Sequence, residues 1–411
     1  MGGVGTSAYS ACVEPVQEIE ALVAHHGRAP GTDAERRAAL HLEDRLRGMG
    51  RDARIEPIAI WPRWPLAHVI HAVAAVVGSV LTVVSPLAGA IVLLVTAVST
   101  FGDLTGTFQL ARRATGRRAS QNVVSPEDGD RPGTLVLVAH YDAGRTGYAF
   151  GPRITERRAA LGQLARRPIG PFQPLFWSTL VLLACAVLRL VGLDATALTV
   201  VQYVATIVLI VAVPLLADVA LSDVVPGAND NASGVACVLD LAERYGDDLE
   251  HFDVWVLLTG AEEGMELGMR AFLRAHRREL PRGRTAFVCV DEVGHGTVRY
   301  ARREGYVLGQ RHHRALLELC ERIADEDADG RYGARAYVSR TASDAYAARV
   351  AGYPAVSVTC LGALDYAPRH HLAVDTVENL DPEAIERAFG FCSELVELID
   401  ERLGPELEEE L

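Results

Sequence analysis

The sequence predicts an α/β domain with a mixed, largely parallel sheet, interrupted by two transmembrane helical hairpins. Short apolar runs that end in polar residues alternate with amphipathic segments, which is typical of buried strands covered by helices. Two long blocks, near residues 65–102 and 172–216, carry almost no charge. Apolar residues make up 49% of the chain although 23% of it is charged. This composition excludes a disordered chain and argues against a purely soluble globule.

The charge balance excludes some classes of function. Forty basic and 53 acidic residues among 411 give a net charge of −13, which argues against a general nucleic-acid binder. Every basic residue is Arg, so the chain has neither a Lys Schiff base nor a phosphate-loop Lys. The seven cysteines show no CxxC spacing, and we expect them to be reduced and mostly buried.

The first predicted element is a helix over residues 34–48. Thr32 and Glu35 form a capping box ahead of AERRAALHLEDRLRGMG. Gly50 follows where a helix commonly ends with glycine. Soluble structure therefore begins before the first apolar block.

The first apolar block predicts a transmembrane hairpin. Leu66–Val84 carries no formal charge, and at about 1.5 Å per residue a helix of this length crosses the core of a bilayer. Ser85 and Pro86 break the run, and Leu87–Gly102 is the returning arm. His68 and His71 lie in the opening turns of the first arm, where we expect packing at the interface rather than metal ligation.

The second apolar block predicts another hairpin, with arms Leu175–Leu193 and Ala197–Leu216. The alternative is two buried core hairpins in a soluble protein. Four long apolar arms exceed what a core needs, so we favour the membrane.

The flanks of the apolar arms agree with this topology. Trp61, Trp64 and Trp177 mark the entry edges, as in an aromatic belt. The turns between the arms carry almost no positive charge apart from Arg189, whereas many arginines flank the other ends: Arg112, Arg113, Arg117, Arg118, Arg153, Arg157, Arg158, Arg166 and Arg167. The positive-inside rule then predicts a multi-pass, four-helix membrane protein whose soluble body is cytoplasmic.

Strands and helices alternate in the remainder. The predicted strands are TLVLVAHYD, FDVWVLLTGAEE, AFVCVDEVG and YPAVSVTCLG, with ASGVACVLDLAERYG as a helix and Pro382–Leu403 as the last long helix. Active sites in such sheets lie beyond the carboxyl ends of the strands.

Metal-type residues follow these strand ends. Five segments carry them: His140-Tyr-Asp142, Asn229–Gly234, Ala261–Gly264, Asp291-Glu292, and His370-His371 with Asp375-Thr376. Carboxylates and imidazoles together suit zinc. Five candidate ligands exceed one tetrahedral site but fit two metals that share a carboxylate and clamp a water. Each segment alone is more often structural, whereas the joint pattern is far more specific.

The motifs resemble the co-catalytic di-zinc aminopeptidases of the aminopeptidase S and aminopeptidase Y type, relatives of glutamate carboxypeptidase and glutaminyl cyclase. The resemblance lies in RAPGTDAERRAALHLEDRL, GANDNASGVA, GAEEGMELGMRAF and HHLAVDTVENLD. It covers about residues 15–60 and 120–403. It implies a three-layer α/β/α zinc-peptidase sandwich.

The resemblance also implies a role for each residue. His140 and Asp291 are expected to bind the first of two Zn²⁺ ions, Glu263 and His371 the second, and Asp230 both. Asp142 is expected to hold His140, and Glu262 to act as the general base. His370 is expected outside the ligand set. The resemblance also implies a cis peptide bond between Asp230 and Asn231, because relatives have one after this Asp.

The substrate side departs from the resemblance. Arg340 occupies the position of the relatives' oxyanion Tyr, and Tyr337 and Tyr346 are nearby alternatives. The Ser343-Asp344-Ala345 stretch lacks the relatives' His. These departures concern the substrate side of the site and leave the metal-type residues in place.

The resulting boundaries divide one peptidase domain around two insertions. They are 1–62 for its N-terminal part, 63–104 for hairpin 1, 105–171 for the His140 segment with a basic juxtamembrane loop, 172–221 for hairpin 2, 222–403 for its main part, and 404–411 for an acidic tail.

The leading prediction is a membrane-embedded di-zinc exopeptidase of the aminopeptidase kind. Its expected partners are a peptide or small amide substrate and the lipid bilayer. One alternative is a di-zinc amidohydrolase acting on a membrane-associated acylated or biosynthetic amide. Another is a non-catalytic, peptidase-like membrane scaffold. The oligomeric state stays open.

Overall fold

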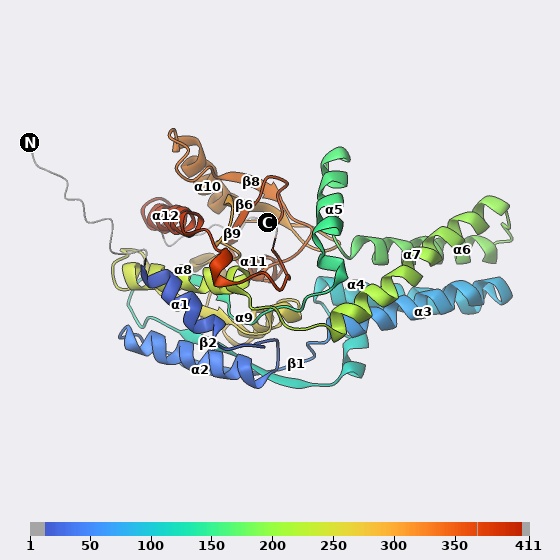
Figure 1. Ribbon diagram of the computed structural model, residues 1–411, viewed down its shortest axis with the longest axis horizontal. Helices are drawn as coiled ribbons and strands as arrows, with labels where there is room; N and C mark the ends of the chain where they lie inside the picture. Colours follow the sequence, from blue (N-terminus) through green and yellow to red (C-terminus); the bar gives the residue numbers. More distant parts are fainter. Residues whose placement is uncertain (1–12, 368, 405–411) are drawn as a thin grey trace, which may run out of the picture.

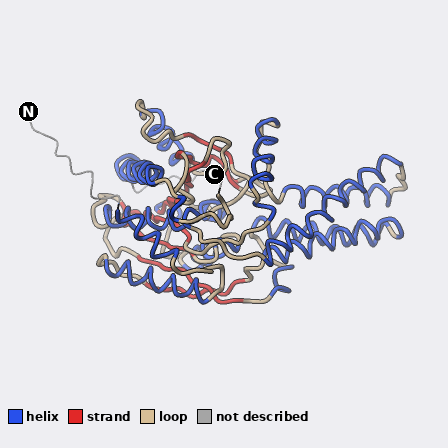
Figure 2. Tube along the Cα trace, viewed as in Figure 1, coloured by secondary structure: helices blue, strands red, loops and turns tan. Residues whose placement is uncertain are grey.

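The computed structural model describes residues 13–367 and 369–404. It has an α/β body from which four long helices project together on one side (Figure 1). Strands gather inside the body and helices cover them (Figure 2). The predicted acidic tail lies, beyond its first residue, outside the described residues.

The body is built on a nine-stranded sheet in the order β1-β2-β4-β3-β5-β9-β6-β7, with β8 paired to β6. Strands β4, β3, β5 and β9 are parallel neighbours, whereas β1, β2 and β6 add antiparallel pairs. The prediction of a mixed, largely parallel sheet is therefore confirmed. The strands are β1 Arg54–Ile60, β2 Arg118–Ser125, β3 Gly133–His140, β4 Phe252–Thr259, β5 Thr285–Val290, β6 Thr297–Glu304, β7 Gln310–Arg311, β8 Arg335–Val338 and β9 Ala355–Leu361.

Helices cover both faces of the sheet because successive strand residues point to opposite sides. Leu135 and Leu137 join the core against α1, α2, α8, α10 and α12. Val136 and Val138 join a second core against α9 and α11. The helices are α1 Val13–Val23, α2 Asp33–Gly48, α8 Gly234–Tyr245, α9 Leu267–Ala275, α10 Arg314–Glu326, α11 Asp344–Val350 and α12 Pro382–Leu398. Six cysteines of the described residues are free and buried, as predicted.

The start of α2 follows the predicted cap in part. The Thr32 side chain accepts a hydrogen bond from the Glu35 amide at 3.2 Å, and Gly50 has a φ of 82°. The Glu35 carboxylate binds the Gly31 amide at 2.8 Å and otherwise points into the body. Glu35 thus does more than close a helix cap.

The four projecting helices are α3 Trp64–Val84, α4 Pro86–Thr105, α6 Gln173–Leu190 and α7 Thr196–Leu221. By length and composition each is able to cross a membrane. They pack on one another through a small apolar core that includes Ala72, Leu93, Leu182 and Leu209.

One further helix, α5 Pro152–Leu164, lies in the segment predicted as a basic juxtamembrane loop. It stands beside the base of the four projecting helices and across their direction (Figure 1). Ile154, Leu161 and Leu164 are exposed on it. The prediction of a loop rested on the many arginines of this segment and not on the spacing of its apolar residues, so the helix was missed.

Two glycines allow α3 and α4 to approach closely. A Cβ on Gly89 would lie 2.1 Å from the Thr82 hydroxyl and 2.7 Å from the Gly78 carbonyl oxygen. A Cβ on Gly78 would lie 2.8 Å from Leu93 Cγ. Small residues at such crossings are what lets apolar helices pack without a hydrophobic driving force.

Replacing Gly89 should therefore loosen hairpin 1. Gly89→Leu is expected to destabilise the protein by about 1–3 kcal/mol, the usual cost of overpacking, measured as a lower midpoint of thermal unfolding in detergent. Val95→Phe adds comparable bulk to an outward side chain that is 60% exposed. An equal loss in both variants would contradict the close approach.

Candidate metal centre

Three neighbouring parallel strands deliver metal-type side chains to one edge of the sheet. Strand β3 ends at His140, β5 is followed by Asp291, and β4 leads into the turn that holds Glu262 and Glu263. Carboxyl ends of parallel strands meet at the same edge, which is where α/β proteins bind ligands.

The other two predicted ligands come from loops. Asp230 lies in the short helical segment η3, Ala228–Ser233, and its peptide bond to Asn231 is cis, in agreement with the expectation. The Asp375 carboxylate accepts hydrogen bonds from the amides of Asn229 and Asp230, at 2.7 and 3.1 Å. His371 follows β9 in the same loop as Asp375, so one carboxylate ties both loops together.

The first group of facing atoms centres on His140. Its Nε2 lies 3.2 Å from Asp230 Oδ1 and 3.4 Å from Asp291 Oδ1. The three residues form a cluster able to hold a metal ion. This is the set that the sequence assigned to the first zinc.

The second group centres on His371. Its Nε2 lies 3.0 Å from Glu263 Oε1 and 3.4 Å from Asp230 Oδ2. The two oxygens of Asp230 therefore face two different groups, as a bridging carboxylate must. All five predicted ligands lie in one cage.

His370 lies closer to this cage than expected. Its Nδ1 is 3.0 Å from Asp230 Oδ2 and 3.1 Å from Glu292 Oε1, and its ring stacks on His371 with the centroids 3.9 Å apart. Asp230, His370 and His371 also form a cluster able to hold a metal. The geometry thus offers two imidazoles for the second position, and a metal count on variants separates them.

The charge of the cage fits dications. Asp142, Asp230, Glu263 and Asp291 crowd around it with Glu262, and the buried Asp291 Oδ1 has no hydrogen-bond partner among the described residues. Imidazole nitrogens with carboxylate oxygens are a donor set that suits zinc. The residues present therefore fit two zinc ions.

A buried guanidinium supports the cage from beneath. Arg28 donates to the carbonyl oxygens of Tyr141, Pro226 and Gly227 at 2.8, 2.5 and 2.6 Å. Burial lowers the pKa of Arg28 to about 10, while Asp375 and Asp142 oppose that shift, so it stays charged. No motif spacing marks Arg28, because its role depends on loops brought together only by folding.

Glu262 has the environment of a general base. Its Oε2 lies 3.9 Å from His140 Nε2. Burial raises the pKa of Glu262 well above its ordinary value; His140 opposes this, and Asp344 and Glu263 add to it. A raised pKa favours uptake of a proton by this carboxyl, which is what a general base requires.

Two carboxylates hold the backbone of the turn that carries Glu262. Asp142 Oδ1 and Oδ2 accept from the amides of Glu262 and Glu263 at 3.1 and 3.0 Å. Glu35 Oε1 accepts from the Ala261 amide at 3.0 Å. Asp142 Oδ1 is also 3.6 Å from His140 Nδ1, so this carboxylate touches both the predicted ligand and the turn.

The hairpins hold the same turn from its other side. The Trp64 indole donates to the Glu263 carbonyl oxygen at 2.9 Å. Arg112 donates to the Gly264 carbonyl oxygen at 2.5 Å. Trp64 begins α3, and Arg112 lies in the short helix η1, Ala111–Thr115, that follows α4, so hairpin 1 and the segment after it contact this turn directly.

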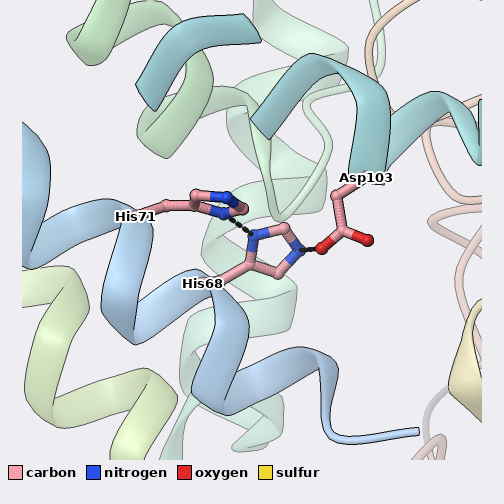
Figure 3. A group of neighbouring side chains, drawn as sticks. All are labelled: His68, His71 and Asp103. Carbon is pink, nitrogen blue, oxygen red and sulfur yellow. Dashed lines mark hydrogen bonds and ion pairs between the residues drawn. The ribbon is translucent and has the colours of Figure 1, made fainter. Parts of the chain in front are cut away.

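A buried polar group inside hairpin 1 continues from Arg112. Arg112 Nε lies 2.5 Å from Asp103 Oδ1, and Asp103 Oδ2 lies 3.8 Å from His68 Nε2. Figure 3 shows His68 between Asp103 and His71. The Nδ1 atoms of the two histidines are 3.3 Å apart. The guanidinium already supplies the positive charge that Asp103 requires, so we interpret the group as structural.

The predicted substrate residues separate into two sets. Tyr337 and Arg340 line a cavity of about 390 Å³ that also reaches Asp291 and Glu292. Tyr346 is buried elsewhere, with Arg270 5.9 Å from its ring centroid. The structure thus brings Tyr337 and Arg340, but not Tyr346, to the cavity beside the cage.

Comparison with known proteins agrees with this geometry. Residues 213–396 match Peptidase family M28. Among solved structures, a Zn-dependent exopeptidase from Parabacteroides distasonis matches with a TM-score of 0.55 and 13% identity, over 95% of this chain and 98% of that one. The LapA aminopeptidase of Legionella pneumophila gives 0.52 and 13%, over 97% and 73%.

A third solved structure widens the range of activities found on this fold. The glutaminyl cyclase of Porphyromonas gingivalis matches with a TM-score of 0.53 and 12% identity, over 94% of this chain and 98% of that one. No curated protein matches the chain. At these identities the solved structures show the fold, and the resemblance to zinc aminopeptidases is confirmed.

The choice between the two imidazoles is testable by metal analysis. His371→Ala is expected to retain about one zinc per chain and His370→Ala about two, because only His371 also faces Glu263. The zinc content of purified protein is measured by mass spectrometry. The reverse pattern would make His370 the ligand.

Contact with hairpin 1 should influence metal affinity. Trp64→Phe keeps the ring but removes the hydrogen bond to Glu263, and outer contacts of this kind change metal affinity roughly 10- to 100-fold. We expect weaker zinc binding in competition with a chromogenic chelator. Trp177→Phe, at an indole that is 53% exposed, is the matched control. Equal affinities in the two variants would show that this contact does not position Glu263.

Proposed function

We propose that this chain, whose residues 213–396 match Peptidase family M28, is a membrane-embedded zinc exopeptidase that removes N-terminal residues. The observation that supports this most is the cage itself. His140, Asp230, Glu263, Asp291 and His371 face one another beside Glu262.

The surface of the four long helices supports the membrane part of the proposal. Their outward side chains are apolar and exposed over much of their length, among them Val77, Val80, Ile91, Val95, Val204, Ile207 and Val211. A continuous apolar surface of this extent is far larger than a soluble monomer tolerates. A bilayer is the environment that covers it.

Arginines support a cytoplasmic body. Arg63, Arg113 and Arg118 lie at the base of hairpin 1 and are exposed, whereas the turn at Ser85 carries no charge. At the far end of hairpin 2, Arg189 is paired with Asp194 at 2.6 Å. The unpaired positive charge is thus on the body side, which the positive-inside rule assigns to the cytoplasm.

The chemistry divides between the metals and the chain. Zinc ions held by His140, Asp230, Glu263, Asp291 and His371 would supply a Lewis acid for the scissile carbonyl and a lower pKa for the attacking water. Glu262 accepts the proton of that water and delivers it to the leaving nitrogen. Asp142 and Glu35 keep Glu262 in place by holding the backbone amides of its turn.

The cavity beside Asp291 suits one end of a peptide. Tyr337 and Arg340 on its wall offer a hydroxyl and a guanidinium to a polarised oxygen. Cleavage of the N-terminal bond requires that the free amine lie close to the cage. The acidic groups of the cage attract such an amine.

Replacing Glu262 should separate metal binding from catalysis. Glu262→Gln is expected to keep about two zinc ions per chain but to lose roughly 10²- to 10⁴-fold in kcat, because the amide cannot take up a proton. Turnover is measured with aminoacyl-fluorophore substrates on detergent-solubilised protein, before and after treatment with a chelator.

Glu318→Gln, in the exposed part of α10, is the matched control for this experiment. Unchanged turnover in Glu262→Gln would remove Glu262 from the base role. Turnover that survives complete removal of the metal would contradict the zinc mechanism.

A further inference from the structure

A second cavity joins the base of the hairpins to the cage. It has a volume of about 490 Å³ and lies between the N-terminal end of α3 and the C-terminal end of α7. Glu263 and His371 line its inner end. We call it the hairpin cavity. Its volume is within the range of about 300–1,000 Å³ that is usual for small-molecule sites.

The wall formed by the hairpins is apolar. Trp64, Pro65 and Leu66 come from α3, and Ala220 and Leu221 from α7. The Leu221 side chain is 83% exposed. Because both helix ends are the body-side ends of predicted membrane spans, this wall continues the apolar surface of the hairpins.

The charges on the wall are mostly positive. Arg63 and Arg118 are exposed and Arg145 is half-buried, whereas the acidic residues of the lining are Asp33 and, at the inner end, Glu263. Arg145 donates to the Ser222 carbonyl oxygen at 2.5 Å and so fixes the end of α7. The mouth therefore has the basic character of a membrane surface zone, while the wall formed by the hairpins is apolar.

Gly144 keeps the inner end open. A Cβ at this position would lie 2.5 Å from His371 Nε2 and 2.6 Å from Glu263 Oε1. Any side chain larger than hydrogen would fill the space between the cavity and the two predicted ligands. A group in the cavity thus has direct access to the cage.

We infer that the hairpin cavity binds an alkyl chain carried by the substrate, and that the substrate class is an amphiphilic peptide or amide drawn from the bilayer. The inference rests on the proposed function. Since that function needs the free amine at the cage, the alkyl chain belongs to the part of the substrate that follows the cleaved bond.

The continuity of the apolar wall with the hairpins carries this assignment. A purely water-soluble peptide would gain no binding free energy from an apolar wall that ends beside the membrane spans. A chain that leaves the bilayer between α3 and α7 stays in contact with Leu66, Ala220 and Leu221 until the amide reaches Glu263. It therefore avoids exposure to water on the way.

The test compares two substrates on the full-length, zinc-loaded protein in lipid nanodiscs. Both are dipeptides with a free amine, one ending in a dodecyl amide and the other in a methyl amide. We expect a kcat/KM at least roughly tenfold higher for the dodecyl amide, in the range that apolar pockets deliver. Ala220→Trp, which fills the cavity, should bring the ratio of the two kcat/KM values close to one.

Val95→Phe adds bulk to a lipid-facing side chain outside the cavity and should leave the ratio as in the unmodified protein. Zinc content is measured in each variant to exclude misfolding. A ratio near one in the unmodified protein, or a ratio that Ala220→Trp does not change, would overturn the inference while the proposed function stands. Cleavage of an N-dodecanoyl dipeptide in preference to the C-terminal dodecyl amide would overturn the assigned end.

A second measurement does not depend on catalysis. A dodecyl amide with a diazirine at the end of its chain is irradiated with the zinc-loaded Glu262→Gln protein, and the labelled peptides are identified by mass spectrometry. Label on residues 64–66 and 219–221 supports the inference, whether or not the dipeptides are cleaved. If neither dipeptide is cleaved, that result refutes the proposed function and leaves the binding of the alkyl chain standing. Label confined to outward positions such as 95 and 204 would overturn the inference, since it shows partition into the bilayer only.

Discussion

The turn that follows β4 is the constraint on which the site depends. Its amide groups are bound by Glu35 and Asp142, and its carbonyl groups by Trp64 and Arg112. The α/β body on one hand, and hairpin 1 with the segment that follows it on the other, therefore hold neighbouring backbone atoms of the same turn. Because these atoms carry both the predicted base and a predicted ligand, neither part of the molecule positions the cage alone.

Charge is the second constraint. Several carboxylates are buried around His140 and His371, and burial of like charges is unfavourable without cations close by. Arg28 supplies one positive charge from below, anchored on three carbonyl oxygens. The donor set leaves room for two more cations above. Such a cage is stabilised by the ions that it is expected to use for chemistry.

The sequence predicted the parts of the site that local pattern governs. His140, Glu263 and Asp291 follow buried strands, so their common edge could be inferred once these strands were predicted to be parallel. Asp230 and His371 lie in loops; the sequence marked their segments as metal-type, but only the resemblance indicated which metal position each would take. Arg28 and Glu35 act through partners more than a hundred residues away, at Tyr141 and Ala261, and no spacing in the chain reports such contacts. Tyr346 was misplaced for a similar reason, since its neighbour Arg270 is distant in sequence.

The position of the two insertions along the chain has a consequence for biosynthesis. His140 is encoded between the hairpins, and Asp230 and the remaining cage residues follow hairpin 2. Because a nascent chain leaves the ribosome from its N-terminus, both hairpins emerge before the cage can close. In the proposed arrangement the protein thus becomes able to hydrolyse peptides only after it has reached its membrane. Newly made chains therefore do not cleave peptides in the cytosol.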